Sequence, residues 1–166
     1  PMSELRSKKE VLRHLTIEDL AERHLPGILA IEPLVNSAAW SEKSFRNELD
    51  HPHGIFRVAS DDRGIAGYGG LWMVVDEAHI TTIAVAPDRH RMGIGERLVV
   101  DLLLRARERG MVCSTLEVRA GNLAAIGLYE KLGYVRSAVR KRYYPDNHED
   151  AVVMWLEGLE SWEPPT

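Results

Sequence analysis

The residues of this sequence that could do chemistry include two glycines in a basic loop, one carboxylate in a predicted strand and one tyrosine on a predicted helix. Gly93 and Gly95 follow a β-branched run that ends before Pro87, and they open a segment whose apolar residues repeat at intervals of three and four. This pattern predicts a strand, a loop and a helix in succession. The first turn of such a helix has unpaired backbone N–H groups and the positive end of the helix dipole, so it can bind an anion.

The glycine loop predicts a site for a phosphate or a pyrophosphate. Positive charge is expected around it from three arginines, Arg89, Arg91 and Arg97. The Lys-Ser/Thr pair of a P-loop is missing, and Glu96-Arg97-Leu98 supplies no third glycine for a dinucleotide fingerprint. A Gly-x-Gly pair also occurs in ordinary turns, so a turn without a ligand is the alternative.

The carboxylate is Glu117, in the middle of a strand predicted over residues 112–119. Because side chains alternate along a strand, Thr115, Glu117 and Arg119 share one face, and Leu116 and Val118 share the other. A carboxylate partly withdrawn from water at such a position can act as a general base. The alternative is an ion pair with Arg119 or with a basic residue of a neighbouring strand.

The tyrosine is Tyr129, on a helix predicted over residues 123–132 that Asn122 caps and Gly133 ends. Its hydroxyl could donate a proton near a reacting centre. Tyr129 shares a helix face with apolar residues such as Ile126 and Leu132, so a core tyrosine is the alternative.

Three more aromatic residues could line a substrate groove. Tyr143 and Tyr144 precede a turn with the acidic residues Asp146, Glu149 and Asp150, which would suit a chain that carries positive charge. Trp40 precedes a helix that Ser41 is expected to cap, and it either lines the groove or packs against Phe45.

Composition limits the class of protein. The chain has 166 residues, 45% hydrophobic and 28% charged, with a formal net charge of −4, which argues against a nucleic-acid partner and permits a cationic substrate. No apolar run is long enough to span a bilayer and no signal peptide is visible, so we expect a cytoplasmic protein without a membrane partner. The single Cys113 and seven histidines show no metal-ligand spacing, so no metal is expected. We expect a monomer or a weak dimer.

The patterns predict an α+β fold, a mixed sheet with helices on both faces. Strands are expected over 11–15, 55–60, 65–75, 79–86, 112–119, 134–142 and 151–157, and helices from Thr16, after Ser41, over 94–109 and over 123–132. The strand–helix–strand unit over 79–119 implies at least one parallel strand pair. One domain is expected over residues 11–158, with a flexible extension at 1–10 and a flexible tail at 159–166.

Four segments form a set that is far more specific than Gly-x-Gly alone: Ile83-Ala84-Val85-x-Pro87, Arg91-Met92-Gly93-Ile94-Gly95, Leu116-Glu117-Val118-Arg119-Ala120-Gly121-Asn122 and Ala125-Ile126-Gly127-Leu128-Tyr129-Glu130-Lys131-Leu132-Gly133-Tyr134. The set resembles the GNAT superfamily of acetyl-CoA-dependent N-acetyltransferases over nearly the whole chain. Three segments, Trp40 to Phe45, Glu117-Val118-Arg119 and Arg142 to Ala151, further resemble the bacterial RimI type, which acetylates the N-terminal alanine of a ribosomal protein.

The resemblance implies a GNAT-like fold, a mostly antiparallel sheet splayed where acetyl-CoA binds. The backbone of the loop would hold the pyrophosphate of coenzyme A, through Arg91, Met92, Gly93, Ile94, Gly95 and Glu96. The strand edge at Ile83, Ala84 and Val85 would bind the pantetheine arm, with the Val85 amide on the thioester carbonyl and Asn122 near the thiol. The family usually has Gln or Arg where this chain has His90.

The resemblance also implies the roles of the other residues. Glu117 matches the general base and Tyr129 the general acid, while Tyr143, Tyr144 and the neighbourhood of Trp40 match the peptide groove. The expected reaction is acetylation of the N-terminal Ala or Ser of a ribosomal protein, by direct attack of the amine in a ternary complex. The alternatives are acetylation of a small amine or a lysine, or a non-catalytic module that binds acyl-CoA.

Overall fold

The computed structural model describes residues 9–165, and in them one mixed sheet of seven strands has the order β1-β2-β3-β4-β5-β7-β6. The strands are β1 (Thr16–Asp19), β2 (Gly54–Asp61), β3 (Gly64–Val74), β4 (Glu77–Val85), β5 (Cys113–Arg119), β6 (Val135–Arg140) and β7 (Ala151–Leu156). The α-helices after β1 are α2 (Leu25–Val35), α3 (Glu42–Leu49), α4 (Ile94–Glu108) and α5 (Leu123–Leu132), with short 3-10 helices at Glu22–His24, Pro87–Arg89 and Leu159–Ser161. The predicted mixed sheet with helices is confirmed.

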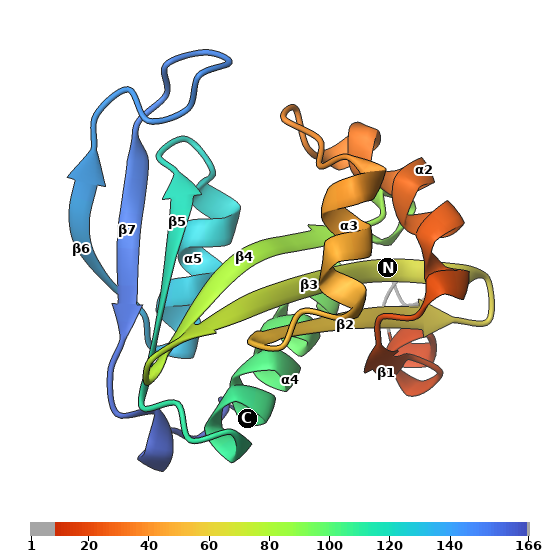
Figure 1. Ribbon diagram of the computed structural model, residues 1–166, viewed down its shortest axis with the longest axis horizontal. Coiled ribbons are helices and arrows are strands. Elements are labelled where there is room, and N and C mark those ends of the chain that lie inside the picture. The colour runs from red at the N-terminus through yellow and green to blue at the C-terminus, as the bar shows by residue number, and fades with distance from the viewer. Residues whose placement is uncertain (1–8, 166) are drawn as a thin grey trace. The chain divides into compact units, whose positions relative to one another are not determined.

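The described chain forms two compact units, residues 9–71 with 82–102 and residues 72–81 with 103–165. In the first unit, α2 and α3 lie on one face of the sheet and α4 lies on the other (Figure 1). Phe45 of α3 is fully buried and contacts Phe56 and Tyr68 edge to face. On the α4 face, a side chain at Gly67 would come within 2.6 Å of the Ala84 carbonyl oxygen, so this close approach requires glycine.

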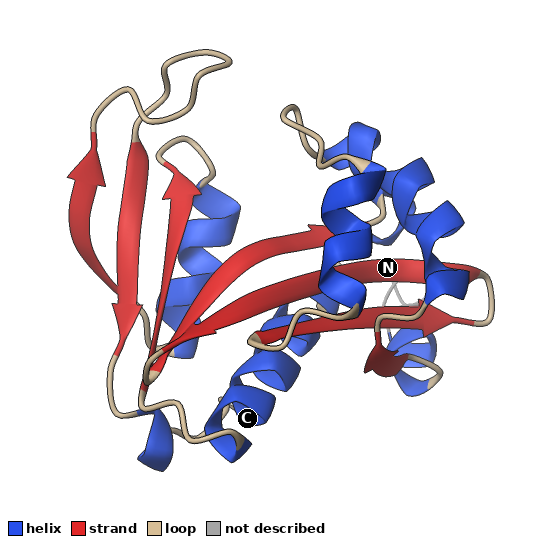
Figure 2. Cartoon of the chain, in the orientation of Figure 1, coloured by secondary structure: helices blue, strands red, loops and turns tan. Residues whose placement is uncertain are grey.

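In the second unit, α5 lies against the β5-β7-β6 part of the sheet (Figure 2). β5 and β7 pair antiparallel along their length, from Ser114 opposite Leu156 to Arg119 opposite Ala151. β4 and β5 pair in parallel, as predicted, and this pairing runs only from Glu77 opposite Cys113 to His79 opposite Thr115. Within residues 9–165, no helix is both long enough and apolar enough to cross a membrane.

The beginning of the described chain differs from the prediction. Residues 9–13 are helical, not the start of a strand over 11–15, because Val11, Leu12 and Leu15 pack together against one core cluster. Thr16–Asp19 is a strand, not the start of a helix. It pairs antiparallel with β2, from Thr16 opposite Ser60 to Asp19 opposite Arg57, and this long-range pairing overrides the local capping pattern.

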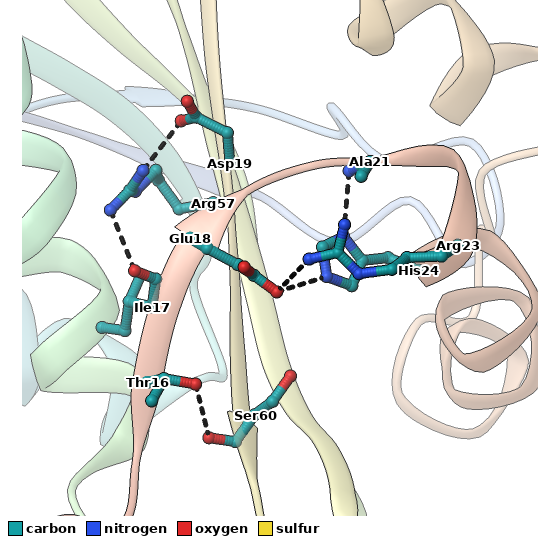
Figure 3. A network of polar contacts seen from close by, with 9 residues as sticks. All are labelled: Thr16, Ile17, Glu18, Asp19, Ala21, Arg23, His24, Arg57 and Ser60. Atoms are coloured by element: carbon teal, nitrogen blue, oxygen red, sulfur yellow. Dashed lines mark hydrogen bonds and ion pairs between the residues drawn. The ribbon is translucent and has the colours of Figure 1, made fainter.

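Two polar side chains hold β1 in place (Figure 3). Arg57 is 6% exposed, and its guanidinium donates to the Asp19 carboxylate at 2.8 Å and to the Ile17 carbonyl at 3.1 Å. Buried His24 accepts from the Ala21 N–H at 2.9 Å through Nδ1, so we assign its proton to Nε2, which lies 2.9 Å from a Glu18 carboxylate oxygen.

The tail that the sequence predicts to be flexible packs against the core as far as Trp162. Leu159 is fully buried and Trp162 is 9% exposed, with its indole N–H donating to the Leu132 carbonyl at 2.8 Å. Arg107 donates to the Trp162 carbonyl at 2.6 Å. An apolar pair separated by polar residues is too short a pattern to reveal this packing. Of the predicted flexible extension at 1–10, residues 1–8 lie outside the described residues.

Candidate functional site

The loop between β4 and α4 has the backbone geometry of an anion cradle. Arg91 and Gly93 have φ values of 66° and 80°, so two left-handed residues flank Met92 just before α4 begins. Such alternation turns successive N–H groups toward a common concavity. Arg97 donates its N–H to the Gly93 carbonyl at 3.1 Å, and the N–H groups before Arg97 belong to the first turn, where a helix offers them no acceptor. The predicted strand, loop and helix are confirmed.

Arg89 does not serve this loop, which corrects the expectation that it adds free charge there. It is 5% exposed, and its guanidinium donates to both carboxylate oxygens of Asp61, at 2.7 and 2.9 Å, and to Asp88 at 2.8 Å. The Arg89 guanidinium lowers the pKa of the Asp61 carboxyl, and Asp61 raises the pKa of Arg89. Arg89 therefore links the 3-10 helix that follows β4 to the end of β2. Arg91 and Arg97 are exposed.

The end of β4 presents an amide on its outer edge. Ala86 donates its N–H to Ala66 of β3 at 2.8 Å. Because successive N–H groups of a strand point to opposite edges, the Val85 N–H points away from β3, toward the edge on which pairing with β5 ends at His79. His90 lies in the loop with its Nε2 at 2.9 Å from the Val85 carbonyl, so it binds the strand end.

A buried hydroxyl also lies on β4 past the end of its pairing with β5. Among the described residues, Thr81 Oγ1 is the only buried side-chain polar atom without a hydrogen-bond partner. Buried polar groups are normally paired, with protein or with bound molecules. An unpaired hydroxyl at this point of β4 fits a strand that holds a polar ligand.

Glu117 is the centre of a polar group on one face of the second unit. Its side chain is 30% exposed, and Arg140 of β6 lies 3.1 Å from its carboxylate. The hydroxyl of Tyr143 also hydrogen-bonds Glu117, and this bond is the main reason that the pKa of Tyr143 is raised. Glu117 therefore has a basic partner, but on β6, which lies beyond β7 and is not a direct neighbour of β5. The expected partner Arg119 bonds other carboxylates.

Tyr129 is 7% exposed and packs edge to face against Tyr134, with ring centroids 5.6 Å apart. Burial, with a smaller contribution from Tyr144, raises the pKa of Tyr129 to about 12. Its phenol therefore keeps its proton at neutral pH, as a proton donor must. Tyr134 is fixed in turn by a 2.7 Å hydrogen bond between its hydroxyl and Ser114 Oγ.

Tyr143 and Tyr144 stand edge to face at 5.1 Å in the loop after β6. The acidic residues of this loop are not free for a cationic chain: Asp146 and Glu149 bond Arg119, and Asp150 bonds Lys141 at 3.3 Å and the Arg142 N–H at 3.0 Å. The expectation of an acidic wall is thus corrected, because these carboxylates hold the loop itself.

Trp40, in the first unit, has the expected packing against Phe45. Its ring packs against Phe45 at 5.3 Å, and its backbone N–H donates to Glu32 at 2.8 Å. Glu32 is 1% exposed and also accepts from the Tyr68 hydroxyl at 2.6 Å. Sequence reasoning missed Glu32. The available signal was its spacing of seven and four from Leu25 and Ile28, which places a carboxylate on the buried face of α2.

Asn122 caps α5 as predicted, because its Oδ1 accepts the Ala125 N–H at 3.2 Å. Gly133 ends that helix in the left-handed conformation, with φ at 109°. Because Oδ1 of Asn122 is used in the cap, the amide nitrogen is the atom of this side chain that can donate a hydrogen bond to a ligand.

The model of the acetyltransferase (GNAT) family matches residues 17–134. The chain belongs to this family. GNAT enzymes use acetyl-CoA as the acetyl donor, and the anion cradle and the strand edge of this chain are of the kind that coenzyme A requires. The resemblance seen in the sequence is confirmed at the level of the family and its fold.

Relatives extend the likeness over most of the chain. The ribosomal protein bS18-alanine N-acetyltransferase of Salmonella typhimurium is 40% identical over 143 residues, which cover 85% of this chain and 96% of that enzyme. The N-alpha-acetyltransferase RimI of Mycobacterium tuberculosis is 35% identical, over 76% of this chain and 80% of that GNAT relative. The crystal structure of the ribosomal-protein-S18-alanine N-acetyltransferase from Escherichia coli superposes with a TM-score of 0.79 at 36% identity, over 86% and 93% of the two chains.

Proposed function

We propose that this GNAT enzyme acetylates the α-amino group of a protein N-terminus, and that its substrate is the N-terminal alanine of ribosomal protein bS18 in the cytoplasm. The observation that carries the proposal is the 40% identity, over 96% of its length, to the Salmonella enzyme that is named for this reaction. The proposal includes N-terminal serine, which differs from alanine by one hydroxyl.

Backbone groups of the first unit hold the acetyl donor in this proposal. The N–H groups of Arg91 to Glu96 bind the pyrophosphate, and the edge of β4 at Ile83, Ala84 and Val85 binds the pantetheine arm. The Val85 N–H donates to the thioester carbonyl oxygen, which gains negative charge as the amine attacks. One side-chain group of the second unit, the amide nitrogen of Asn122, is proposed to donate near the thiol end. The orientation of the Val85 N–H away from β3 supports this assignment.

Side chains of the second unit move the protons. Glu117 accepts a proton from the attacking amine, directly or through one water, and Tyr129 donates one to the departing sulfur. An α-amine titrates near 7.7 to 8.0 and a lysine near 10.4, so roughly a tenth of N-termini but fewer than about one lysine in a thousand are neutral at pH 7. One carboxylate therefore suffices for an N-terminus. Direct attack needs no nucleophile from the enzyme.

Trp40, Tyr143 and Tyr144 contact the first residues of the substrate peptide. The three rings offer apolar surface, and the two tyrosines add hydroxyl groups that can bond a peptide backbone. Tyr143 already bonds Glu117, so an entering amine would exchange with an existing hydrogen bond at the carboxylate.

The test is incubation with acetyl-CoA and four acceptors, followed by mass spectrometry. The acceptors are a peptide with a free N-terminal alanine, the same peptide with a blocked N-terminus, a blocked peptide with one lysine, and a polyamine. We expect one acetyl group on the free N-terminus only. Acetylation of lysine or polyamine in its place would refute the N-terminal assignment, and acetyl-CoA binding without any transfer would point to a non-catalytic module.

A further inference from the structure

Arg119 stands on the same face of β5 as Glu117, two residues further along, and the roles proposed above do not include it. Its side chain is 23% exposed. It reaches into the loop over residues 141–150, the segment that joins β6 to β7 and carries Tyr143 and Tyr144. This segment is called the tyrosine loop below.

The guanidinium of Arg119 makes contacts at several points of the tyrosine loop. Nη1 and Nη2 each lie 3.1 Å from an oxygen of the Asp146 carboxylate, in a two-pronged pair. Nη1 also lies 3.3 Å from Asn147 Oδ1 and 3.4 Å from Glu149 Oε1. The plane of the guanidinium lies over the Tyr144 ring, 3.9 Å from its centroid. Arginine is suited to this combination because its planar fork can bond a carboxylate and stack on a ring at once.

Further hydrogen bonds hold the tyrosine loop near the Arg119 contact. Glu149 accepts the Gly121 N–H at 2.8 Å through its carboxylate, and its carbonyl accepts the Tyr144 N–H at 3.2 Å. The Tyr144 carbonyl accepts the His148 N–H at 2.8 Å. His148 and Arg142 have φ values of 58° and 52°, a conformation that costs energy for residues with a side chain. The loop therefore needs side-chain contacts to keep this shape.

We propose that Arg119 is a positioning residue that holds the tyrosine loop, and with it Tyr143 and Tyr144, in the conformation that binds the acceptor peptide. This inference rests on the proposed function, because it deepens the peptide-binding role given to the two tyrosines. A loop already ordered before the peptide arrives loses less conformational freedom on binding, so the peptide binds more tightly.

Arg57 shows what a purely structural arginine looks like in the same protein. It is 6% exposed and bonds Asp19 and Asp101 across β1, β2 and α4, and none of these partners is assigned to the peptide. Arg119 differs because the side-chain contacts described above lie in the tyrosine loop and its ring contact is to a proposed substrate-binding residue. Loss of Arg119 should therefore affect the loop locally.

The kinetic test uses Arg119→Ala and Arg119→Lys, with Arg136→Ala as the matched control. Arg136 is an exposed arginine of β6 whose carboxylate partner, Glu130, is 3.5 Å away. We expect Arg119→Ala to raise the KM for the peptide about tenfold, with kcat lowered less than about threefold and the KM for acetyl-CoA unchanged. Lysine keeps the charge but not the fork or the stacking, so its effect should be close to that of alanine. Arg136→Ala should match the wild type.

Hydrogen exchange of backbone amides, read by mass spectrometry without any substrate, tests the loop independently of activity. We expect faster exchange over 141–150 in Arg119→Ala, with β5 and β7 unchanged. Exchange that accelerates equally in β5 and β7 would make Arg119 a structural residue, and unchanged exchange with an unchanged peptide KM would overturn the proposal. Should Arg119→Ala not fold, Asp146→Asn weakens the same contact from the loop side, with the same expected results. A wild type that leaves every N-terminal peptide unmodified refutes the proposed function, while the exchange result still decides whether Arg119 holds the loop.

Discussion

Between Ile83 and Glu96 the groups proposed to bind acetyl-CoA are backbone N–H groups of one short segment, whereas the groups proposed to move protons and bind peptide are side chains from several elements. Glu117 comes from β5, Tyr129 from α5, and Tyr143 from the loop after β6. The first region depends on φ values, such as 80° at Gly93. The second depends on side-chain partners, such as Arg140 at 3.1 Å from Glu117.

This difference predicts which kind of substitution should impair each region. A backbone site tolerates changes of side chain and is damaged by changes that alter φ. A side-chain site responds in the opposite way, because one atom of one residue does the chemistry. The effects of four substitutions on the two regions should follow this rule, and three of them are paired with a control at another residue.

Glu117→Gln should have the largest effect. The amide keeps the size of the side chain and can still accept a hydrogen bond from Tyr143, but it cannot take a proton. We expect kcat to fall by about 100-fold, the lower end of a general-base contribution, with acetyl-CoA binding unchanged. Initial rates with the alanine peptide measure kcat, and a binding titration measures the affinity for acetyl-CoA. The control is Glu130→Gln, an exposed carboxylate of α5. Near-normal turnover of Glu117→Gln would remove Glu117 from this role.

Tyr129→Phe should lower kcat less, by about tenfold. The leaving group is a thiol, whose pKa of about 8.5 makes its protonation less demanding than deprotonation of the amine. The matched control is the neighbouring buried Tyr134→Phe, which loses the bond to Ser114 and about 1 kcal/mol of stability but keeps its kcat. Equal kcat in both variants would contradict a role for Tyr129 in proton transfer.

The pH dependence of Tyr129 follows from its raised pKa of about 12. The phenol stays protonated in the folded protein through pH 10, so this residue should cause no loss of rate up to that pH. An unfolded tyrosine titrates near about 10, so between these values the unfolded chain binds fewer protons and the free energy of unfolding falls as the pH rises. Tyr129→Phe should make that fall less steep, as measured by urea unfolding at several pH values.

The same contrast explains what could be predicted from the sequence. Strand, loop and helix around Gly93 were predicted correctly, because all their signals lie within one contiguous segment. Glu117 was placed correctly by alternation, but its partner Arg140 lies 23 positions away and was not foreseen. Arg89 was assigned to the loop because nothing near it in sequence reveals Asp61, at a separation of 28 residues. Side-chain pairing depends on strand register, which local patterns leave open.

The first residues show the same limit for secondary structure. Thr16 to Asp19 has the local pattern of a helix start, yet pairs with β2 more than 35 positions away. Glu32 is the converse case, because its helical spacing from Ile28 was a local signal of burial that could have been used. The two cases differ in how far apart in the sequence the residues lie whose contact decides the structure.

Gly93→Ala tests the backbone region, with Gly110→Ala as its control. The two glycines have φ values of 80° and 85°, so alanine should cost each variant about 1 to 2 kcal/mol of stability. Only Gly93→Ala should also weaken acetyl-CoA binding, by about fivefold, because it disturbs the cradle. Thermal unfolding and binding titrations measure these effects. Equal acetyl-CoA affinity in both variants would show that the loop at Gly93 does not bind acetyl-CoA.

His90→Gln should have the smallest effect, although the resemblance seen in the sequence predicts Gln or Arg at position 90. The imidazole bonds the Val85 carbonyl at 2.9 Å and is exposed, and a glutamine amide can donate the same hydrogen bond. We expect the KM for acetyl-CoA to change less than about twofold in His90→Gln and at most about threefold in His90→Ala, within the worth of one exposed hydrogen bond. A larger change would mean that a side chain of the loop matters as much as its backbone for acetyl-CoA binding. The contrast between the two regions would then fail at His90, whose side chain bonds the end of β4.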